Sequence, residues 1–493
     1  MNAIGRNNSI KTSFPAPAFA GRVTAVPADV SGQRGKFGIL LLAFYVFLLV
    51  SRVLDLSPIW WLRVPLILLI LLVVLTVARG EIGHAFSSPT TKVFGLFTIW
   101  VVVCFPFSYW RAGSIDSVHN AVESFVIFVI IVQMVRTWDD WQKIAGGYAF
   151  AAFIASLYGF HFARYEGGRL SLVGGTFADP NDFALTLLVG LPFLWLKASL
   201  ASDVKKIFYW IATLPVFMTV ARTGSRAGML AAASITVVSF LFAKPGQKVL
   251  IAVCAVVGLA AGAVFLPPYL KARYLTVLSP DSTTPLDAGN QSQLGADMAS
   301  SNERQLLLKQ SIHMTFEHPL FGVGPGVFSF AAWDERKATE GAGGLALVSH
   351  NTYTQISSET GLPGFFLFIG TVFLCVKYTL SDYRSLKEKD PESAKFARYL
   401  LVSMSGLFPG IFFLSVGYTH FLALFIAMSA SLHIVMNTKT VEAPRASSFS
   451  PVAGTTARKT PPLRKRVPSY LRSRGLVSPN KAEMPVARAE DER

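Results

Sequence analysis

The residues with the most evident chemistry are His350 and Asn351, at the edge of an apolar run that is long enough to enter a membrane. A titratable side chain is costly to place there without a use. Because the ordinary pKa of histidine is about 6.5, a neutral imidazole can take a proton from a hydroxyl near neutral pH. A lone histidine is more often structural, but Asn351 and Glu359 are placed to orient this one. His350 is therefore the candidate general base.

Several short connections that we expect on the outer face of the membrane contain arginine as their basic residue. These arginines are Arg111, Arg164, Arg169, Arg222 and Arg226. The rules of membrane insertion do not favour cations on that face. A guanidinium offers a planar fork of donors that matches phosphate oxygens and never loses its proton. The pattern predicts an anion site, with a phosphate as the best-matched anion.

Arg222 and Arg226 are four residues apart, so they share a face if the turn between them is helical. Gly224 and Gly228 allow a backbone or a ligand to come close. The alternative is that both arginines extend to lipid headgroups from the helix ends. For Arg222 the two interpretations stay open, whereas Ser225 and Gly228 beside Arg226 favour a function.

The hydrophilic segment before His350 contains a predicted helix at Ser300–Pro319, with Arg304 in its first turn. An anion there would also be stabilised by the positive end of the helix dipole. The alternative is that Arg304 pairs with Glu303 or Glu317 or lies on a solvated face. His313 and His318 are read as surface or packing residues.

A second polar motif, GGTFADPND at 174–182, places Asp179 and Asn181 at the mouth of a span. The carboxylates of Asp179 and Asp182, which flank Pro180 and Asn181, can order an acceptor hydroxyl or a metal, but Asp-Pro-Asn-Asp is also a good helix start, and the cap is favoured. The sequence has no histidine, cysteine or aspartate cluster at metal-ligand spacing, no phosphate loop and no Gly-x-Ser-x-Gly. No metal or other cofactor is expected.

Composition indicates an integral membrane protein. The chain has 493 residues, 52% hydrophobic and 15% charged, and its mean hydropathy is +0.46. The net charge of +16 is spread over short loops and a basic tail, so membrane topology accounts for it without nucleic acid. Cys104, Cys254 and Cys375 all lie in apolar runs and predict no disulfide framework.

The fold class is an all-α polytopic membrane protein with about twelve transmembrane helices and one large, partly helical periplasmic loop between helices 9 and 10. Each apolar run is about long enough to span a hydrocarbon core. The expected spans are 37–54, 59–78, 93–109, 118–135, 142–161, 182–199, 205–221, 227–243, 248–267, 356–379, 398–417 and 420–436.

The polar segments complete the domain organisation. Residues 1–36 form a disordered cytoplasmic leader, 37–267 hold helices 1–9, 268–352 the periplasmic loop, 353–437 helices 10–12, and 438–493 a disordered basic cytoplasmic tail. Lysines and arginines in the even-numbered connections favour cytoplasmic termini. The basic tail can lie on an anionic leaflet.

Four segments together resemble the superfamily of O-antigen ligases and O-antigen or exopolysaccharide polymerases, the bacterial membrane glycosyltransferases. They are GGTFADPNDFA at 174–184, SRAGML at 225–230, the stretch from Arg304 through HPLFGVGPGVF, and HNTYTQISSETGLPG at 350–364. They follow the order of that family and cover about half of the chain.

The resemblance implies metal-independent, inverting transfer of a glycan from an undecaprenyl-diphosphate carrier to an acceptor hydroxyl at the periplasmic face of the inner membrane. It places diphosphate binding on Arg226 and Arg304, with Arg222 beside them, and the catalytic role on His350. Asn351, Glu359, Asp179, Asn181 and Arg169 support the site. The implied partners are the carrier-linked donor, a glycan or lipid acceptor, membrane lipids and other polysaccharide assembly and export proteins.

Three activities remain open on these residues. The first expectation is a polymerase that joins carrier-linked repeat units of exopolysaccharide or O-antigen. A ligase would instead attach the finished glycan to lipid A-core or protein. A lipid-linked oligosaccharide flippase or other transporter also suits about twelve spans, but the polar residues gather at one face and no clear internal repeat is evident, which favours surface chemistry.

Overall fold

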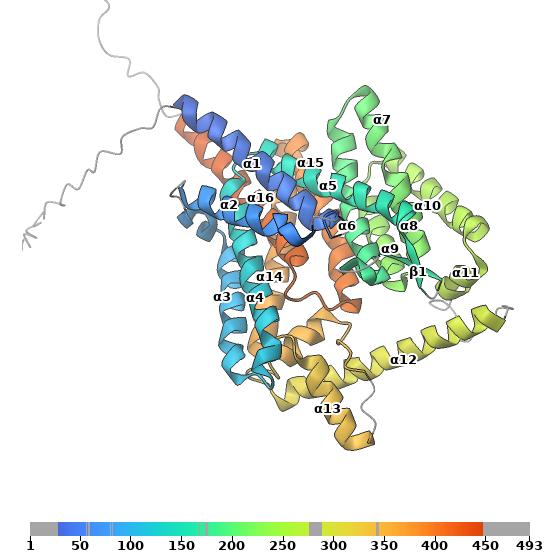
Figure 1. Ribbon diagram of the computed structural model, residues 1–493. Helices are drawn as coiled ribbons and strands as arrows, with labels where there is room; N and C mark the ends of the chain where they lie inside the picture. Colours follow the sequence, from blue (N-terminus) through green and yellow to red (C-terminus); the bar gives the residue numbers. More distant parts are fainter. Residues whose placement is uncertain are drawn as a thin grey trace, which may run out of the picture. The chain divides into compact units, whose positions relative to one another are not determined.

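The structure is a computed structural model that describes residues 28–55, 57, 60–78, 80, 82–166, 168–172, 176–275, 288–341 and 345–446. The chain divides into two units, Met1–Val441 and Glu442–Arg493, and every contact described below lies within the first. Helices dominate the described residues, and a single short β-hairpin accompanies them (Figure 1).

The helices are α1 (Ala28–Ser51), α2 (Val64–Ala78), α3 (Pro89–Cys104), α4 (Arg111–Met134), α5 (Trp138–His161), α6 (Pro180–Leu200), α7 (Asp203–Ile211), α8 (Thr213–Thr223), α9 (Arg226–Phe242), α10 (Pro245–Phe265), α11 (Pro268–Leu275), α12 (Ala288–Glu317), α13 (Phe328–Glu340), α14 (Thr352–Lys389), α15 (Pro391–Gly410) and α16 (His420–Ala446). Strands β1 (Arg164–Glu166) and β2 (Arg169–Ser171) pair antiparallel between α5 and α6.

The described residues include nine helices that are long and apolar enough to cross a membrane. Three shorter apolar helices, Lys36–Ser51, Val64–Ala78 and Arg226–Phe242, coincide with the expected spans at 37–54, 59–78 and 227–243. A polytopic, predominantly helical membrane protein is thereby confirmed. The count of twelve spans stays a prediction, as does the orientation of the termini.

Helix α6 lies at the centre of the packing, in contact with α5, α8, α9 and α15, and 78% of its span is buried. Its apolar residues form one continuous core with the helices around it. Helix α10 is the opposite case, because none of its span is buried and it packs chiefly against α9. An apolar helix of this length that stays uncovered by protein is suited to lipid.

Three features differ from the sequence expectation. The β1–β2 hairpin, with Tyr165 paired to Leu170, adds a small sheet to the expected all-α fold. Helix α1 begins at Ala28 and α16 extends to Ala446, so both enter segments for which disorder was predicted. The rest of those predictions, 1–27 and 447–493, lies outside the described residues.

Helix α12 also differs, because it begins at Ala288 rather than near Ser300 and ends at Glu317. Arg304 is therefore in the middle of the helix, and the prediction that it lies in the first turn, at the positive end of the dipole, is wrong. The residues before Ser300 include alanine, glutamine, leucine and methionine and no proline, so the helix continues through them. Helices α12 and α13 share a separate small core around Leu307, Met314 and Phe328.

A break inside α14 docks the segment before α13. Gly361 has φ 68° and ψ −176°, and Pro363 lacks the N–H that would bond the carbonyl of Glu359. That carbonyl accepts instead from the Gly324 N–H at 3.1 Å. Because Leu362 turns its N–H to the Pro319 carbonyl at 2.8 Å, the Ser358 carbonyl is also released from the helix, and it accepts from Val323 at 2.8 Å. The break thus binds residues 319–324 to α14.

We expect Gly361→Ala to lower the free energy of unfolding by about 1–3 kcal/mol, since alanine is strained at this positive φ. A Cβ at this position would also collide with the Leu320 carbonyl. The matched control is Gly370→Ala in the same helix, where a Cβ would make only ordinary contact with Val93. Thermal unfolding in detergent measures both variants, and equal midpoints would contradict the account of the break.

Candidate functional site

His350 lies in the turn that leads into α14, with a left-handed backbone at φ 50°. The neighbouring Asn351 caps the helix, because its Oδ1 accepts from the N–H groups of Tyr353 at 2.9 Å and Thr354 at 3.2 Å. The Ser349 hydroxyl lies 3.1 Å from that of Ser415 in the segment before α16. The turn is therefore fixed from both sides, which fixes the backbone of His350.

Charged residues from two distant segments lie within electrostatic reach of His350. Its pKa falls below the ordinary value of 6.5, first because the imidazole is largely buried and then because the Arg304 guanidinium is near. The Asp179 carboxylate acts in the opposite direction and raises this pKa. Three of the predicted site residues therefore interact electrostatically: His350 in the turn before α14, Arg304 on α12 and Asp179 at the start of α6.

Asn181 connects this group to the start of α9. Its amide nitrogen donates to Asp179 Oδ1 at 2.8 Å, and its Oδ1 accepts from the Ser225 hydroxyl at 2.8 Å. Asp179 also accepts from the backbone N–H of Asn181, so the predicted cap is confirmed. Ser225 in turn caps α9 through a bond from the Gly228 N–H. One buried amide therefore fixes the N-termini of α6 and α9 relative to each other.

Two further guanidiniums fasten the turn between α8 and α9. Arg169 on β2 donates to the Thr223 carbonyl at 3.0 Å and to Asn181 Oδ1 at 3.1 Å. Arg273 on α11, which is only 4% exposed, donates to the Gly224 carbonyl at 2.7 Å. Both guanidiniums also affect the pKa of Tyr274. Burial raises that pKa to about 12, and the two cations oppose the rise. Positive charge is thus concentrated beside the first residue of α9, Arg226.

Arg273 was missed by the sequence analysis. It stands in the short motif KARYL beside Lys271, which reads as an ordinary basic stretch at the start of a loop. The only local signal is the pair of aromatic residues Tyr269 and Tyr274 around it. Its burial depends on a turn almost fifty residues earlier, and a single sequence does not show that proximity.

Arg222 and Arg226 do not share a helix face, which corrects the sequence expectation. Helix α8 ends at Thr223, Gly224 is left-handed at φ 60°, and α9 begins at Arg226. Arg222 is exposed, and its guanidinium lies over the Phe160 ring at 5.2 Å. This placement favours the alternative in which the side chain extends along the helix end. Arg226 is half-buried in the first turn of α9, so the positive end of the helix dipole acts there.

Glu359 stabilises the loop rather than His350. Its carboxylate accepts from the N–H groups of Gly326 at 2.9 Å and Phe328 at 3.3 Å, and Phe328 begins α13. A carboxylate at a helix start satisfies donors that have no partner inside the helix. The side chains of Asn351 and Glu359 were expected to orient the imidazole, but Asn351 bonds the backbone of α14, and Glu359 bonds the backbone N–H groups of Gly326 and Phe328.

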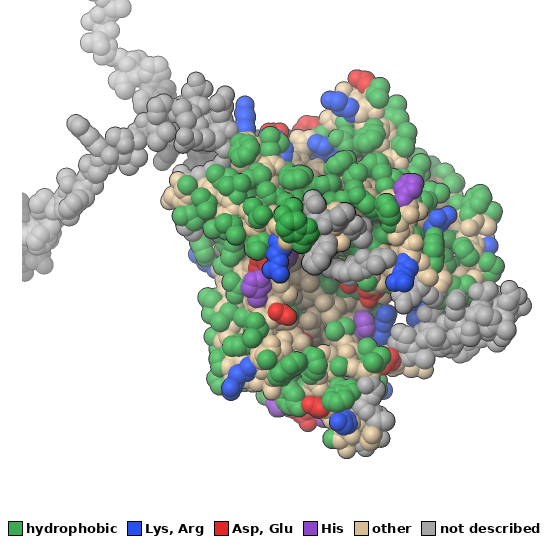
Figure 2. Space-filling view, in the orientation of Figure 1, with side chains coloured by type: hydrophobic (Ala, Val, Ile, Leu, Met, Phe, Trp, Pro, Cys, Tyr) green, Lys and Arg blue, Asp and Glu red, His purple; other side chains and the backbone are tan. Residues whose placement is uncertain are grey.

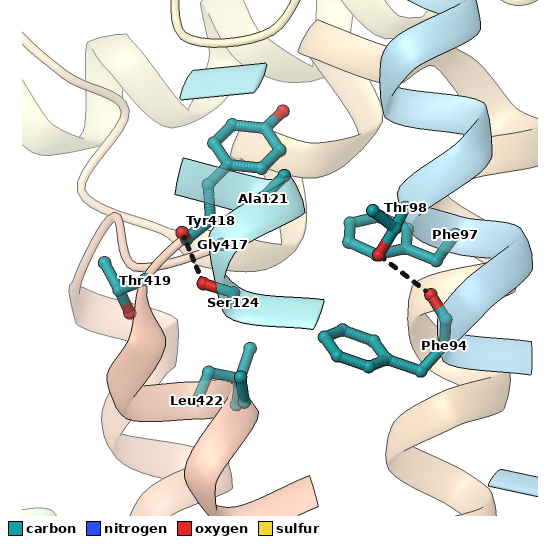
Figure 3. Close-up of a pocket in the computed structure, with 10 residues that line it drawn as sticks. Phe94, Phe97, Thr98, Ala121, Ser124, Gly417, Tyr418, Thr419 and Leu422 are labelled. Carbon is teal, nitrogen blue, oxygen red and sulfur yellow. Dashed lines mark hydrogen bonds between the residues drawn. The ribbon is translucent and has the colours of Figure 1, made fainter. Parts of the chain in front are cut away.

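Figure 2 shows a hollow in the face drawn, with histidine, acidic and basic side chains on its α4 side and on its α12 side. A separate small pocket lies between α3, α4 and the start of α16 (Figure 3). It is lined mainly by apolar residues, and the Ser124 hydroxyl in it donates to the Tyr418 carbonyl at 3.2 Å. It has room for about one water molecule. Of the described site residues named above, none lines this pocket.

The comparisons with known proteins identify part of the chain. Residues 211–369 match a family model described as O-antigen ligase. This segment is similar to O-antigen ligases. The match covers about a third of the chain and supports the superfamily of O-antigen ligases and polymerases that the motifs predicted. No curated protein matches the chain.

The matched segment contains Arg226, Arg273, Arg304 and His350. Asp179 and Asn181 precede it, although their side chains are bonded to the start of α9 within it. The site therefore combines residues of the matched domain with residues outside it.

We expect Asn181→Ala to lower the free energy of unfolding by about 1–3 kcal/mol, because Arg169 and Ser225 each lose a buried acceptor. The control is Asn120→Ala, the same change at an exposed position of α4. Thermal unfolding in detergent compares the two variants. A midpoint of Asn181→Ala equal to that of the control would contradict the connecting role of this amide.

Proposed function

We propose that the chain transfers a glycan from an undecaprenyl-diphosphate carrier to an acceptor hydroxyl on the periplasmic face of the bacterial inner membrane. The observation that carries the proposal is the convergence of Arg304, Asp179 and the imidazole of His350. Through Asn181 and Ser225, this group is continuous with the start of α9 and with Arg226. These contacts support the proposal that the general base and the cations suited to a diphosphate belong to one site.

The chemistry is direct displacement at the anomeric carbon of the donor sugar. His350 takes the proton of the acceptor hydroxyl as its oxygen attacks that carbon. The bond between the anomeric carbon and the diphosphate oxygen breaks, and the lipid diphosphate leaves with the electron pair, so the configuration inverts. Arg226 and Arg304 offset the negative charge that builds up on the leaving oxygen. The N-terminus of α9 acts in the same direction.

The surroundings of His350 suit this role. Burial and the Arg304 cation favour the neutral imidazole, which is the form that accepts a proton. Asp179 limits this lowering of the His350 pKa, because its negative charge stabilises the imidazolium that forms when the proton is taken up. An unopposed drop in the pKa would leave a weaker base.

The acceptor decides between two activities of this class. In a polymerase the acceptor belongs to another carrier-linked repeat unit, and this was the first expectation from the sequence. The description of the matched family, O-antigen ligase, favours transfer of a finished glycan to lipid A-core or protein. Surface polysaccharide from a deletion strain separates them. Single repeats without polymer indicate a polymerase, and full chains still on the carrier indicate a ligase.

We expect Arg304→Ala and Arg226→Ala each to reduce transfer at least about 100-fold, the loss typical of removing one donor to a developing charge. Arg304→Lys should recover only part of the rate, because it restores the charge without the fork. Lys309→Ala is the matched control, since Lys309 is an exposed cation on the same helix. Reconstituted protein with carrier-linked glycan provides the assay.

The same assay separates a transferase from a transporter. A transporter moves the carrier-linked glycan without changing it, whereas a transferase yields longer or newly attached chains. Full activity of Arg304→Ala or Arg226→Ala, or movement of glycan without a new bond, would reject the proposal.

A second variant tests the charge balance at His350. The base works only when deprotonated, so kcat/KM falls as the pH drops through the His350 pKa, which lies below 6.5. Since Asp179 raises that pKa, Asp179→Asn should move this acidic limb to lower pH. Asparagine also caps a helix well, so the start of α6 is preserved. A limb that stays in place or moves to higher pH would contradict the assignment of His350 as the base.

A further inference from the structure

Three side chains with metal-binding atoms meet where α12 packs against α13. His313 and Glu317 lie one turn apart on α12, and Glu335 comes from α13. One nitrogen or oxygen from each side chain lies within 4.8 Å of those of the other two. All three residues are at least partly exposed to solvent, so the cluster is accessible from outside.

The separations within the cluster suit a shared ion better than direct hydrogen bonds. His313 Nδ1 lies 3.5 Å from Glu317 Oε2 and 3.6 Å from Glu335 Oε1. Hydrogen bonds from nitrogen to oxygen are typically about 2.7–3.2 Å long. Ligands bound to a tetrahedral zinc at about 2.0–2.2 Å lie roughly 3.3–3.6 Å from one another. The two separations from His313 therefore match those between ligands of one zinc ion.

A fourth residue lies beside the cluster and orients one of its carboxylates. Gln310, one turn before His313, is only 9% exposed, and its Nε2 donates to Glu335 Oε2 and to the Ala332 carbonyl, both at 2.9 Å. These bonds fix the orientation of the amide beside the cluster. Its buried Oε1 has no hydrogen-bond partner in the described part of the chain.

We propose that His313, Glu317 and Glu335 bind a divalent cation of the zinc type, with Gln310 beside them. One imidazole with two carboxylates suits Zn²⁺ better than Mg²⁺ or Ca²⁺, which prefer oxygen ligands alone. Two carboxylates and a neutral imidazole carry two negative charges, and a divalent ion balances them. The bond from Gln310 to Glu335 orients one ligand, as the outer partners of metal sites commonly do.

The ion would have a structural role separate from glycan transfer. It would join α13 to α12, the helix that carries Arg304. The small core around Leu307, Met314 and Phe328 already holds these helices together, and the cation would add a second link near the C-terminal end of α12. The ligands come from the two loop helices and are distinct from His350 and Asp179.

The test uses the full chain, purified in detergent and stripped of metal, with calorimetric titration of Zn²⁺. One site per chain is expected, and His313→Ala and Glu335→Gln should each weaken binding at least about tenfold. The matched control is His318→Ala, which removes an exposed histidine just after α12 and should leave the affinity unchanged. Mg²⁺ at the same concentration should not compete.

A measurement on the unaltered protein keeps the proposal testable if a variant fails to fold. Co²⁺ in place of Zn²⁺ should give the intense visible absorption of a tetrahedral site, and added Zn²⁺ should abolish it. The proposal is overturned by an unaltered chain that binds neither ion. It is equally overturned if His313→Ala keeps its affinity or if His318→Ala loses as much affinity as His313→Ala.

Discussion

The amide of Asn181 is the interaction on which the rest of the site depends. A buried amide must satisfy its donors and acceptor inside the protein, and this one does so with partners from three separate segments. Those bonds fix the start of α6, the start of α9 and strand β2 relative to one another. Arg226 follows the α9 cap directly, so its position is a consequence of this arrangement.

The same requirement explains the other half of the site. The break at Gly361 releases two carbonyls of α14, and the segment before α13 supplies the N–H groups that satisfy them. Glu359 then bonds the first N–H of α13, and α13 packs on α12. The helix that carries Arg304 is thereby attached to the helix that begins beside His350. Of the two polar networks, the one around Asn181 fixes the start of α9 with Arg226, and the one around the α14 break attaches the helix that carries Arg304.

Much of the fold could be predicted because it depends on local patterns. Apolar runs predicted the helices, and the Asp-Pro-Asn-Asp motif predicted the cap of α6. The convergence of His350 with Arg304 was expected from the family resemblance rather than from spacing. What the sequence did not reveal depends on distant partners: Arg273 is buried against Gly224, and Glu359 bonds a backbone 33 residues away. The start of α12 was missed because residues that could cap a helix at Ser300 also continue one.

The most direct measurement of the central claim is a structure of the protein in a lipid nanodisc with undecaprenyl diphosphate bound. The account predicts that the diphosphate lies between the guanidiniums of Arg226 and Arg304, with the imidazole of His350 facing the oxygen that carries the sugar in the donor. Diphosphate bound elsewhere, or bound out of reach of His350, would contradict it.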